Sequence, residues 1–142
     1  MKHKIVAKVL VQNAEHKFLV LTRSLTDESS PGKPDFPGGG VEENETYQLA
    51  AVRELQEESG ISTTPEALAL LYAFTRTEDD GEIIVRMLFG LMVNNPEVAL
   101  SHEHSDFTWV DKDQLGSLFA SRSWGVAVDF VMRHNILQTD FS

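Results

Sequence analysis

Cysteine is absent from the 142-residue chain. Disulfide bonds, thiolate zinc sites and a catalytic thiol are therefore excluded. Basic residues are also scarce, with 12 Lys and Arg against 22 Asp and Glu, which gives a formal net charge of −10. Proteins whose main partner is nucleic acid usually present a basic stripe, so we expect no such partner. A small anionic substrate stays compatible with this charge, because metal ions and a few arginines can supply local positive charge.

Long apolar runs are missing as well. No stretch approaches the ~18 consecutive apolar residues of a membrane span, so we expect no membrane association. The apolar run near the N-terminus is short, is broken by Lys8 and lacks a small-residue cleavage site, which favours a strand over a signal peptide. These features predict a cytoplasmic protein. With 42% hydrophobic residues, residues 1–142 are expected to form a single domain.

Runs of β-branched residues alternate with patterns of helical period along the chain. Strands are expected at residues 5–11 and 18–22, which a polar turn joins, at 68–75 and 82–93 around a second turn, and at 107–110. Helices are expected at residues 46–59, from Asp111 or Asp113 to Leu118, and from Trp124 to Asn135. Asn44 or Thr46 is expected to cap the first of these helices and Gly60 to end it, and its apolar stripe is expected to consist of Leu49, Ala51, Val52 and Leu55. Residues 24–40 are rich in proline and glycine and are expected to form a long functional loop. The class is α/β or α+β, with a mixed sheet between helices.

Three glutamates fall on one face of the helix expected at residues 46–59. Glu54, Glu57 and Glu58 are spaced i, i+3 and i+4, so their carboxylates are neighbours. Each exposed pair of like charges costs about 0.2–0.5 kcal/mol, and the helix dipole disfavours negative charge near the C-terminal end. Oxygen ligands gathered in this way suit Mg²⁺ or Mn²⁺. A solvated acidic surface is the alternative explanation.

The glutamates belong to a longer pattern, which runs Gly39, five residues, Glu45, seven residues, Arg53-Glu54-Leu55, one residue, Glu57-Glu58, one residue, Gly60-Ile61. This pattern resembles the Nudix box and fills every defining position of it. The preceding Phe36-Pro37-Gly38-Gly39 also resembles the family. The chain is thus similar to MutT-like Nudix hydrolases, and the resemblance implies the Nudix-type α/β/α sandwich with a mixed central β-sheet over nearly the whole chain.

The resemblance implies an activity and a cofactor. It implies metal-dependent hydrolysis, at a phosphorus atom, of a nucleoside diphosphate linked to another group. By position, Glu54, Glu57 and Glu58 match the family's ligands for Mg²⁺ or Mn²⁺, and they are the expected catalytic residues. Arg53 and Glu45 match the pair that orients the loop and the helix in the family, so Arg53 is expected to be required for catalysis.

Residues before the helix are candidates for substrate binding. Gly38, Gly39 and Gly40 are expected to permit positive φ and close backbone approach, so that the loop bends back against the helix. Arg23 matches a position where relatives hold an arginine near substrate phosphates, and a guanidinium suits that role. The alternative for Arg23 is a salt bridge to the acidic helix. Arg76 and Arg86 are weaker candidates for phosphate binding.

The segment 101–106 supplies a further candidate. In some family members a glutamate six positions before a tryptophan approaches the metal, and here Trp109 follows Glu103 by six. Glu103 is therefore predicted to be a catalytic residue and a metal ligand, with an exposed loop acid as the alternative and Asp106 as the rival. His102 and His104 are expected to be solvated loop residues, with metal ligands or a general base as the alternative. The aromatic residues expected in the core, rather than against a base, are Phe36, Tyr72, Phe74, Trp109 and, in the core or an interface, Trp124.

The sequence defines the substrate less well. A proline that favours ADP-ribose and a tyrosine that favours diadenosine polyphosphates are both absent after the box, where Arg76 and residues 77–79 stand. Gly40 occupies a position where several triphosphate-hydrolysing members carry lysine. A (deoxy)nucleoside triphosphate, cleaved to monophosphate and pyrophosphate, is predicted by default, and pterin triphosphates and nucleotide sugars remain open. The alternatives are a non-catalytic Nudix domain that senses a nucleotide or binds a partner, and an acidic structural module. Dimers are common among similar proteins, so a homodimer stays open.

Overall fold

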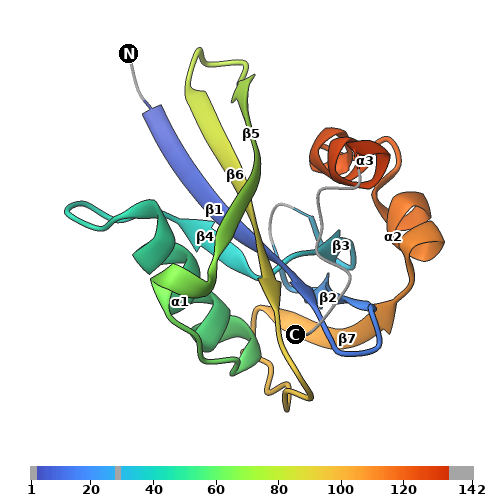
Figure 1. Ribbon diagram of the computed structural model, residues 1–142. Coiled ribbons are helices and arrows are strands. Elements are labelled where there is room, and N and C mark those ends of the chain that lie inside the picture. The colour runs from blue at the N-terminus through green and yellow to red at the C-terminus, as the bar shows by residue number, and fades with distance from the viewer. Residues whose placement is uncertain (1–2, 28–29, 135–142) are drawn as a thin grey trace.

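The computed structural model describes residues 3–27 and 30–134. These residues form a mixed seven-stranded sheet with one helix on one face and two on the other (Figure 1). The strands are β1 His3–Gln12, β2 Phe18–Arg23, β3 Pro34–Asp35, β4 Gly38–Gly40, β5 Ala69–Thr77, β6 Ile83–Met92 and β7 His104–Val110. The helices are α1 Tyr47–Ser59, α2 Lys112–Phe119 and α3 Gly125–His134, and a 3₁₀ turn spans Pro65–Ala67. This arrangement is the α/β/α sandwich that the sequence predicts.

Strand β1 is the centre of the sheet. The order is β3-β2-β1-β6-β5, with β4 paired to β1 and β7 paired to β2. β1 runs parallel to β6 along its whole length and antiparallel to β4, so both edges of β1 are paired. Val9 and Val11 pack towards α1, while Leu10, between them, packs towards α2 and α3. Burial on both faces explains why this strand reads as a nearly continuous apolar run.

The ends of the helices follow from local capping. The Thr46 hydroxyl accepts a hydrogen bond from the Leu49 N–H at the start of α1, and Gly60 ends the helix in the left-handed conformation with φ 76°. Asp111 and Gln114 form a reciprocal capping box at the start of α2. The predicted caps at Thr46, Gly60 and Asp111 are thereby confirmed. Leu49, predicted to face the core, is instead 47% exposed, and Ala50, Ala51 and Leu55 are the buried apolar residues of α1.

The segment 24–40 differs most from the prediction. It contains two short strands: β3 pairs with β2, and β4 pairs with β1 at Val6, Ala7 and Lys8. β7 also begins at His104, earlier than expected, because it pairs with β2 as far as Arg23. These pairings join residues far apart in sequence, and a Gly-Gly-Gly strand has no β propensity of its own that would reveal them. Helix α3 begins at Gly125, and the predicted end at Asn135 lies outside the described residues.

Phe36 and Trp124 are buried as expected, whereas Tyr72, Phe74 and Trp109 are partly buried and pack against the core. Phe36 is fully buried and stacks on Phe119 with ring centroids 4.3 Å apart, and Trp124 meets Phe74 edge-on at 5.4 Å. Within the described part of the chain, no helix combines the length and the apolar character needed to cross a membrane.

Candidate active site

A cavity of about 780 Å³ opens on the face of the sheet that α2 and α3 partly cover. Its floor comes from β1 and β6, and its far wall comes from the turn between α2 and α3. Gly38, Gly39 and Gly40 of β4 and two glutamates of α1 form its opposite edge. The packing of α1 against β1 and β4 therefore determines where those glutamates meet the cavity.

Arg53 clamps α1 to the segment before it. Its Nε and Nη2 donate to the two carboxylate oxygens of Glu45 at 2.8 and 3.1 Å, and Nη2 also donates to the Gly40 carbonyl at 3.2 Å. Nη1 donates to Glu54 Oε1 at 3.0 Å. The hydrogen bonds from Glu45 raise the pKa of Arg53, and Arg53 in turn lowers the pKa of Glu45. A planar fork with five donors makes this set of contacts possible, and a lysine could not reproduce it.

Glu58 is the most buried glutamate of the motif. It is 3% exposed, and its Oε1 lies 3.4 Å from the Gly38 N–H that donates to it. The pKa of Glu58 is raised to about 9. Burial is the main cause, a hydrogen bond shared with the Glu54 carboxyl acts in the same direction, and Lys8 opposes both. Glu54 and Glu58 both line the cavity, whereas Glu57 does not. The Glu57 side chain is 55% exposed and lies 3.5 Å from Arg53 Nη1.

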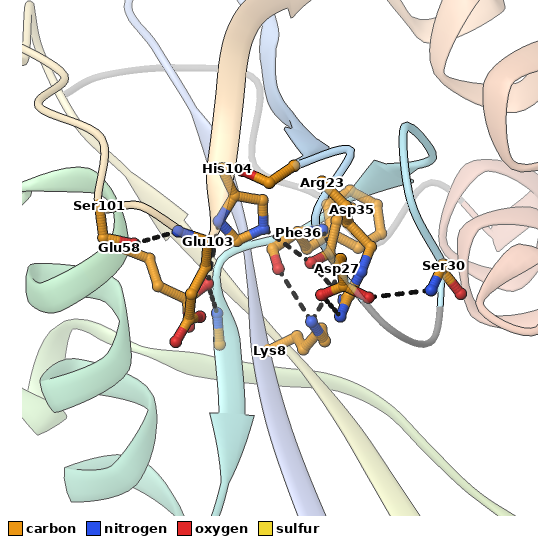
Figure 2. A network of polar contacts seen from close by, with 12 residues as sticks. Lys8, Arg23, Asp27, Ser30, Asp35, Phe36, Glu58, Ser101, Glu103 and His104 are labelled. Atoms are coloured by element: carbon orange, nitrogen blue, oxygen red, sulfur yellow. Dashed lines mark hydrogen bonds and ion pairs between the residues drawn. The ribbon is translucent and has the colours of Figure 1, made fainter.

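A buried ionic network lies beside Glu58 (Figure 2). Asp35 accepts hydrogen bonds from Lys8 Nζ at 2.8 Å and from Arg23 Nη1 at 3.0 Å, and its Oδ2 lies 2.9 Å from His104 Nε2. Burial alone would raise the pKa of Asp35, but Lys8, His104 and Arg23 outweigh it and hold the pKa at about 2. Arg23 forms ion pairs with Asp27 and Asp35, neither of which lies on α1.

His104 connects this network to the glutamates. It is 5% exposed, and its Nδ1, which has no hydrogen-bond partner, lies 3.7 Å from Glu58 Oε1. The expectation that His104 is a solvated loop residue is therefore wrong, because β7 begins at His104 and carries its side chain into the interior. Lys8 and Asp35 also belong to this network, and neither was predicted from the sequence to be part of the site. The available signal was Lys8 itself, since a lysine inside a strand buried on both faces needs an anionic partner.

Asp35, Glu58 and His104 offer ligand atoms that all lie within 4.8 Å of one another. A cation held by all three would lie beside Lys8 and Arg23, which already neutralise Asp35. Repulsion from those two charges disfavours such a metal site. Asp35 and His104 are better explained as a support that orients Glu58, since His104 lies between Asp35 and Glu58.

The glycines of β4 have different roles. Gly38 has φ +143°, and a Cβ there would lie 2.3 Å from the Ala7 carbonyl oxygen. At Gly39 a Cβ would lie 2.8 Å from the Glu54 carboxylate carbon, and at Gly40 it would meet nothing within 4 Å. Positive φ, expected at all three, occurs only at Gly38. Gly38 and Gly39 thus let β4 lie close to β1 and to α1, while Gly40 has no such constraint.

The structure separates the candidates of segment 101–106. The exposed Glu103 lines the cavity, while Asp106 and His102 are exposed and do not. The Glu103 backbone is fixed, because its carbonyl accepts from the Ser24 N–H at 2.9 Å and its N–H donates to Ser101 Oγ at 3.3 Å. The Asp106 carboxylate accepts instead from the Phe107 N–H at 2.8 Å. Arg23 also lines the cavity, so the two candidates outside the Nudix motif, Glu103 and Arg23, are both part of its lining.

A family model described as NUDIX domain matches residues 2–129. The chain belongs to the NUDIX family. Its solved structural relatives include the MutT protein from Methanosarcina mazei Go1, with a TM-score of 0.81 and 24% identity over 96% of this chain and 97% of that one. The MutT-like resemblance predicted from residues 39–61 is confirmed.

Two curated relatives carry names of hydrolases. The NUDIX chain is 41% identical over 70 residues to an 8-oxo-dGTP diphosphatase from Escherichia coli (strain K12), which covers 49% of this chain and 52% of that protein. It is 27% identical over 124 residues to the nucleoside triphosphatase NudI from Klebsiella pneumoniae (strain 342), and this match covers 81% of this chain and 86% of that protein. The match therefore spans about half the length of the first of these relatives.

The three glycines of β4 provide a matched series of variants. Gly38→Ala should lower the free energy of unfolding by about 3 kcal/mol or more, because it combines positive φ with a backbone clash. Gly39→Ala should cost less, since the Glu54 carboxylate can shift, and Gly40→Ala should change stability by under about 0.5 kcal/mol. Urea unfolding of the three variants measures these differences. Equal stability of Gly38→Ala and Gly40→Ala would contradict the assigned close approach of β4 to β1.

Proposed function

We propose that this NUDIX domain, residues 1–142, is a metal-dependent pyrophosphohydrolase of a nucleoside diphosphate linked to another group. The leading substrate is a (deoxy)nucleoside triphosphate, cleaved to monophosphate and pyrophosphate. The observation that carries the proposal is the placement of Glu54, Glu58 and Glu103 on one cavity, with the Arg53 clamp behind them. The names of the two curated relatives, a diphosphatase and a nucleoside triphosphatase, support the same class of substrate.

The residues present fit a divalent cation. Burial raises the pKa of Glu58 to about 9, so without a cation this carboxyl retains a proton beside Glu54. A divalent ion would replace that proton and compensate the charge of both carboxylates. Glu54, Glu57, Glu58 and Glu103 offer only oxygen ligands, which suit Mg²⁺ or Mn²⁺. Glu57 presents its exposed carboxylate from the solvent side of the same helix.

Each part of the site then has a chemical role. A bound divalent cation neutralises phosphate oxygens and lowers the pKa of a bound water molecule. Arg53 keeps Glu54 aligned with β4, and the Gly38 N–H together with His104 fixes the orientation of Glu58. Glu103, on the opposite wall, would accept the proton of the attacking water. Arg23 and the backbone of Gly38, Gly39 and Gly40 would contact the phosphates, since all four line the cavity.

The rival function is a non-catalytic domain that senses a nucleotide. Such a domain needs the cavity but has no need of a glutamate whose burial raises its pKa, as at Glu58. Retention of Glu54, Glu57 and Glu58 therefore favours catalysis. A screen that measures phosphate release from a panel of nucleotides, with Mg²⁺ and with Mn²⁺, separates the two functions, because only the enzyme turns over any member.

Removing one charge from the metal-binding face should abolish most of the activity. Glu57→Gln or Glu58→Gln should reduce kcat by about a hundredfold or more, equivalent to about 3 kcal/mol of transition-state stabilisation. Both variants should keep their melting temperature, because a repulsion is lost. The matched control is Glu66→Gln, which removes an exposed glutamate away from the cavity and should keep full activity. Near-normal turnover of Glu57→Gln and Glu58→Gln at saturating Mg²⁺ would refute the metal assignment.

The role of Glu103 can be separated from that of its neighbours. Glu103→Gln keeps the size of the side chain but removes its charge, so kcat should fall by about ten- to a thousandfold with little change in KM. Asp106→Asn and His102→Ala, whose side chains lie outside the cavity, should each cost less than about tenfold. Steady-state kinetics on the best substrate of the screen measures all three variants. A severe loss in Asp106→Asn beside a nearly normal Glu103→Gln would show that Glu103 is the wrong residue.

A further inference from the structure

Several basic residues line the end of the cavity that lies away from Glu54 and Glu58. Ile84 of β6 is paired with Lys4 on β1, one neighbouring strand, and with Arg76 on β5, the other neighbouring strand. Arg86 follows Ile84 by two residues and therefore lies on the same face of β6. Arg122 comes from the turn between α2 and α3. All four line the cavity, and we call them the distal basic group. The proposed mechanism uses none of them.

Arg86 is the member of this group that has buried guanidinium N–H donors without an acceptor in the described part of the chain. Its Nε and Nη1 are buried and have no hydrogen-bond partner, and no ion pair of Arg86 occurs within residues 3–27 and 30–134. Its guanidinium lies 5.4 Å from the centre of the Trp124 ring, which Phe74 contacts edge-on. Burial lowers the pKa of Arg86, and Arg76 adds to the effect. Stacking on a tryptophan orients a guanidinium, but it does not replace hydrogen-bond acceptors for buried N–H donors.

The basic residues nearer Glu54 and Glu58 have acidic partners. Lys8 and Arg23 both form ion pairs with Asp35. In the distal basic group, by contrast, the described residues give one weak ion pair, Arg76 with Glu78 at 3.9 Å. The described part of the chain therefore sets one acidic residue, Glu78, against the four basic residues of this group, which leaves an excess of positive charge at the end of the cavity that lies away from the proposed metal site.

The distribution of charge over the chain strengthens this contrast. Of the 12 Lys and Arg in the chain, seven line this one cavity, namely Lys4, Lys8, Arg23, Lys33, Arg76, Arg86 and Arg122. A chain of net charge −10 could place its few basic residues on its acidic surface, where they would reduce repulsion. Concentrating them in a cavity costs self-repulsion and favours an anionic ligand there.

We propose that the distal basic group binds a second phosphate of the substrate, separate from the anhydride that is cleaved. The inference rests on the proposed function, which places the anhydride at the glutamates. The substrates concerned are nucleotides with a further phosphate, for example on the ribose. The neutral edge of a base would satisfy some donors of Arg86, but it would leave the charge of the group uncompensated.

Binding without turnover tests this directly. In buffer with a chelator and no metal, calorimetry compares adenosine 3′,5′-bisphosphate with adenosine 5′-monophosphate. The native protein should bind the bisphosphate at least about tenfold more tightly, as charge-assisted hydrogen bonds to a second phosphate provide. Arg86→Met should reduce this preference to under about threefold, and Arg86→Lys should retain part of it. Equal affinity of the native protein for the two nucleotides would overturn the proposal.

A charge-matched control separates a local site from the general field. Arg133→Met also removes one positive charge, from an exposed residue on α3 that pairs with Asp129 outside the cavity, and it should keep the full preference. Equal loss in Arg133→Met and Arg86→Met would overturn the site. Thermal melting checks the fold: Arg86→Met should melt no lower than the native protein, because an uncompensated buried charge is removed.

Kinetics links the second phosphate to the reaction. With Mg²⁺, kcat/KM for a nucleoside 5′-triphosphate that carries a 3′-phosphate should exceed that for the plain triphosphate, and Arg86→Met should reduce the ratio. A ratio of one in the native protein would contradict a second phosphate site that serves catalysis. If neither nucleotide is hydrolysed, the proposed pyrophosphohydrolase function fails, and the metal-free binding comparison still decides whether the site exists.

Discussion

The carboxyl groups of Glu54 and Glu58 share a hydrogen bond at a place where burial raises the pKa of Glu58, and the rest of the site is arranged around that contact. Arg53 fixes one of them through a hydrogen bond at 3.0 Å, and the Gly38 N–H approaches the other at 3.4 Å. Gly39 leaves the space that Glu54 needs, because a Cβ there would overlap its carboxylate. The fold therefore holds two acidic groups close together at a place where a divalent cation would compensate the charge of both.

The buried network behind Glu58 extends this arrangement across the sheet. Lys8 on β1, Asp35 on β3 and His104 on β7 are brought together by strand pairing rather than by proximity in sequence. Asp35 neutralises two cations, so the charge that acts on a ligand is largely that of the glutamates and of the distal basic group. Acidic groups at one end and uncompensated basic groups at the other give the cavity a polarity that suits a nucleotide with phosphates at two positions.

Much of the fold could be predicted, because local signals determine it. Alternating apolar runs located the long strands, and Thr46, Gly60 and Asp111 marked the helix ends through capping. The Arg53 clamp followed from the spacing of the Nudix motif. Asp35 and His104 were missed because their partners are far away in sequence, and a histidine next to serines and glutamates looks solvated until β7 is known to begin there. The β4 strand was missed for a similar reason, since its pairing with β1 is non-local.

The dependence of the melting temperature on divalent cations tests the central claim most directly. If a divalent cation binds at the Glu54 and Glu58 carboxyl groups, Mg²⁺ or Mn²⁺ should raise the melting temperature of the native protein in a concentration-dependent way. Linkage gives about 2.7 kcal/mol of added stability at a cation concentration one hundred times the Kd. The triple variant Glu54→Gln/Glu57→Gln/Glu58→Gln should melt no lower than the native protein without metal and should show no metal response. A response in the triple variant equal to that of the native protein would place the cation elsewhere and contradict the account.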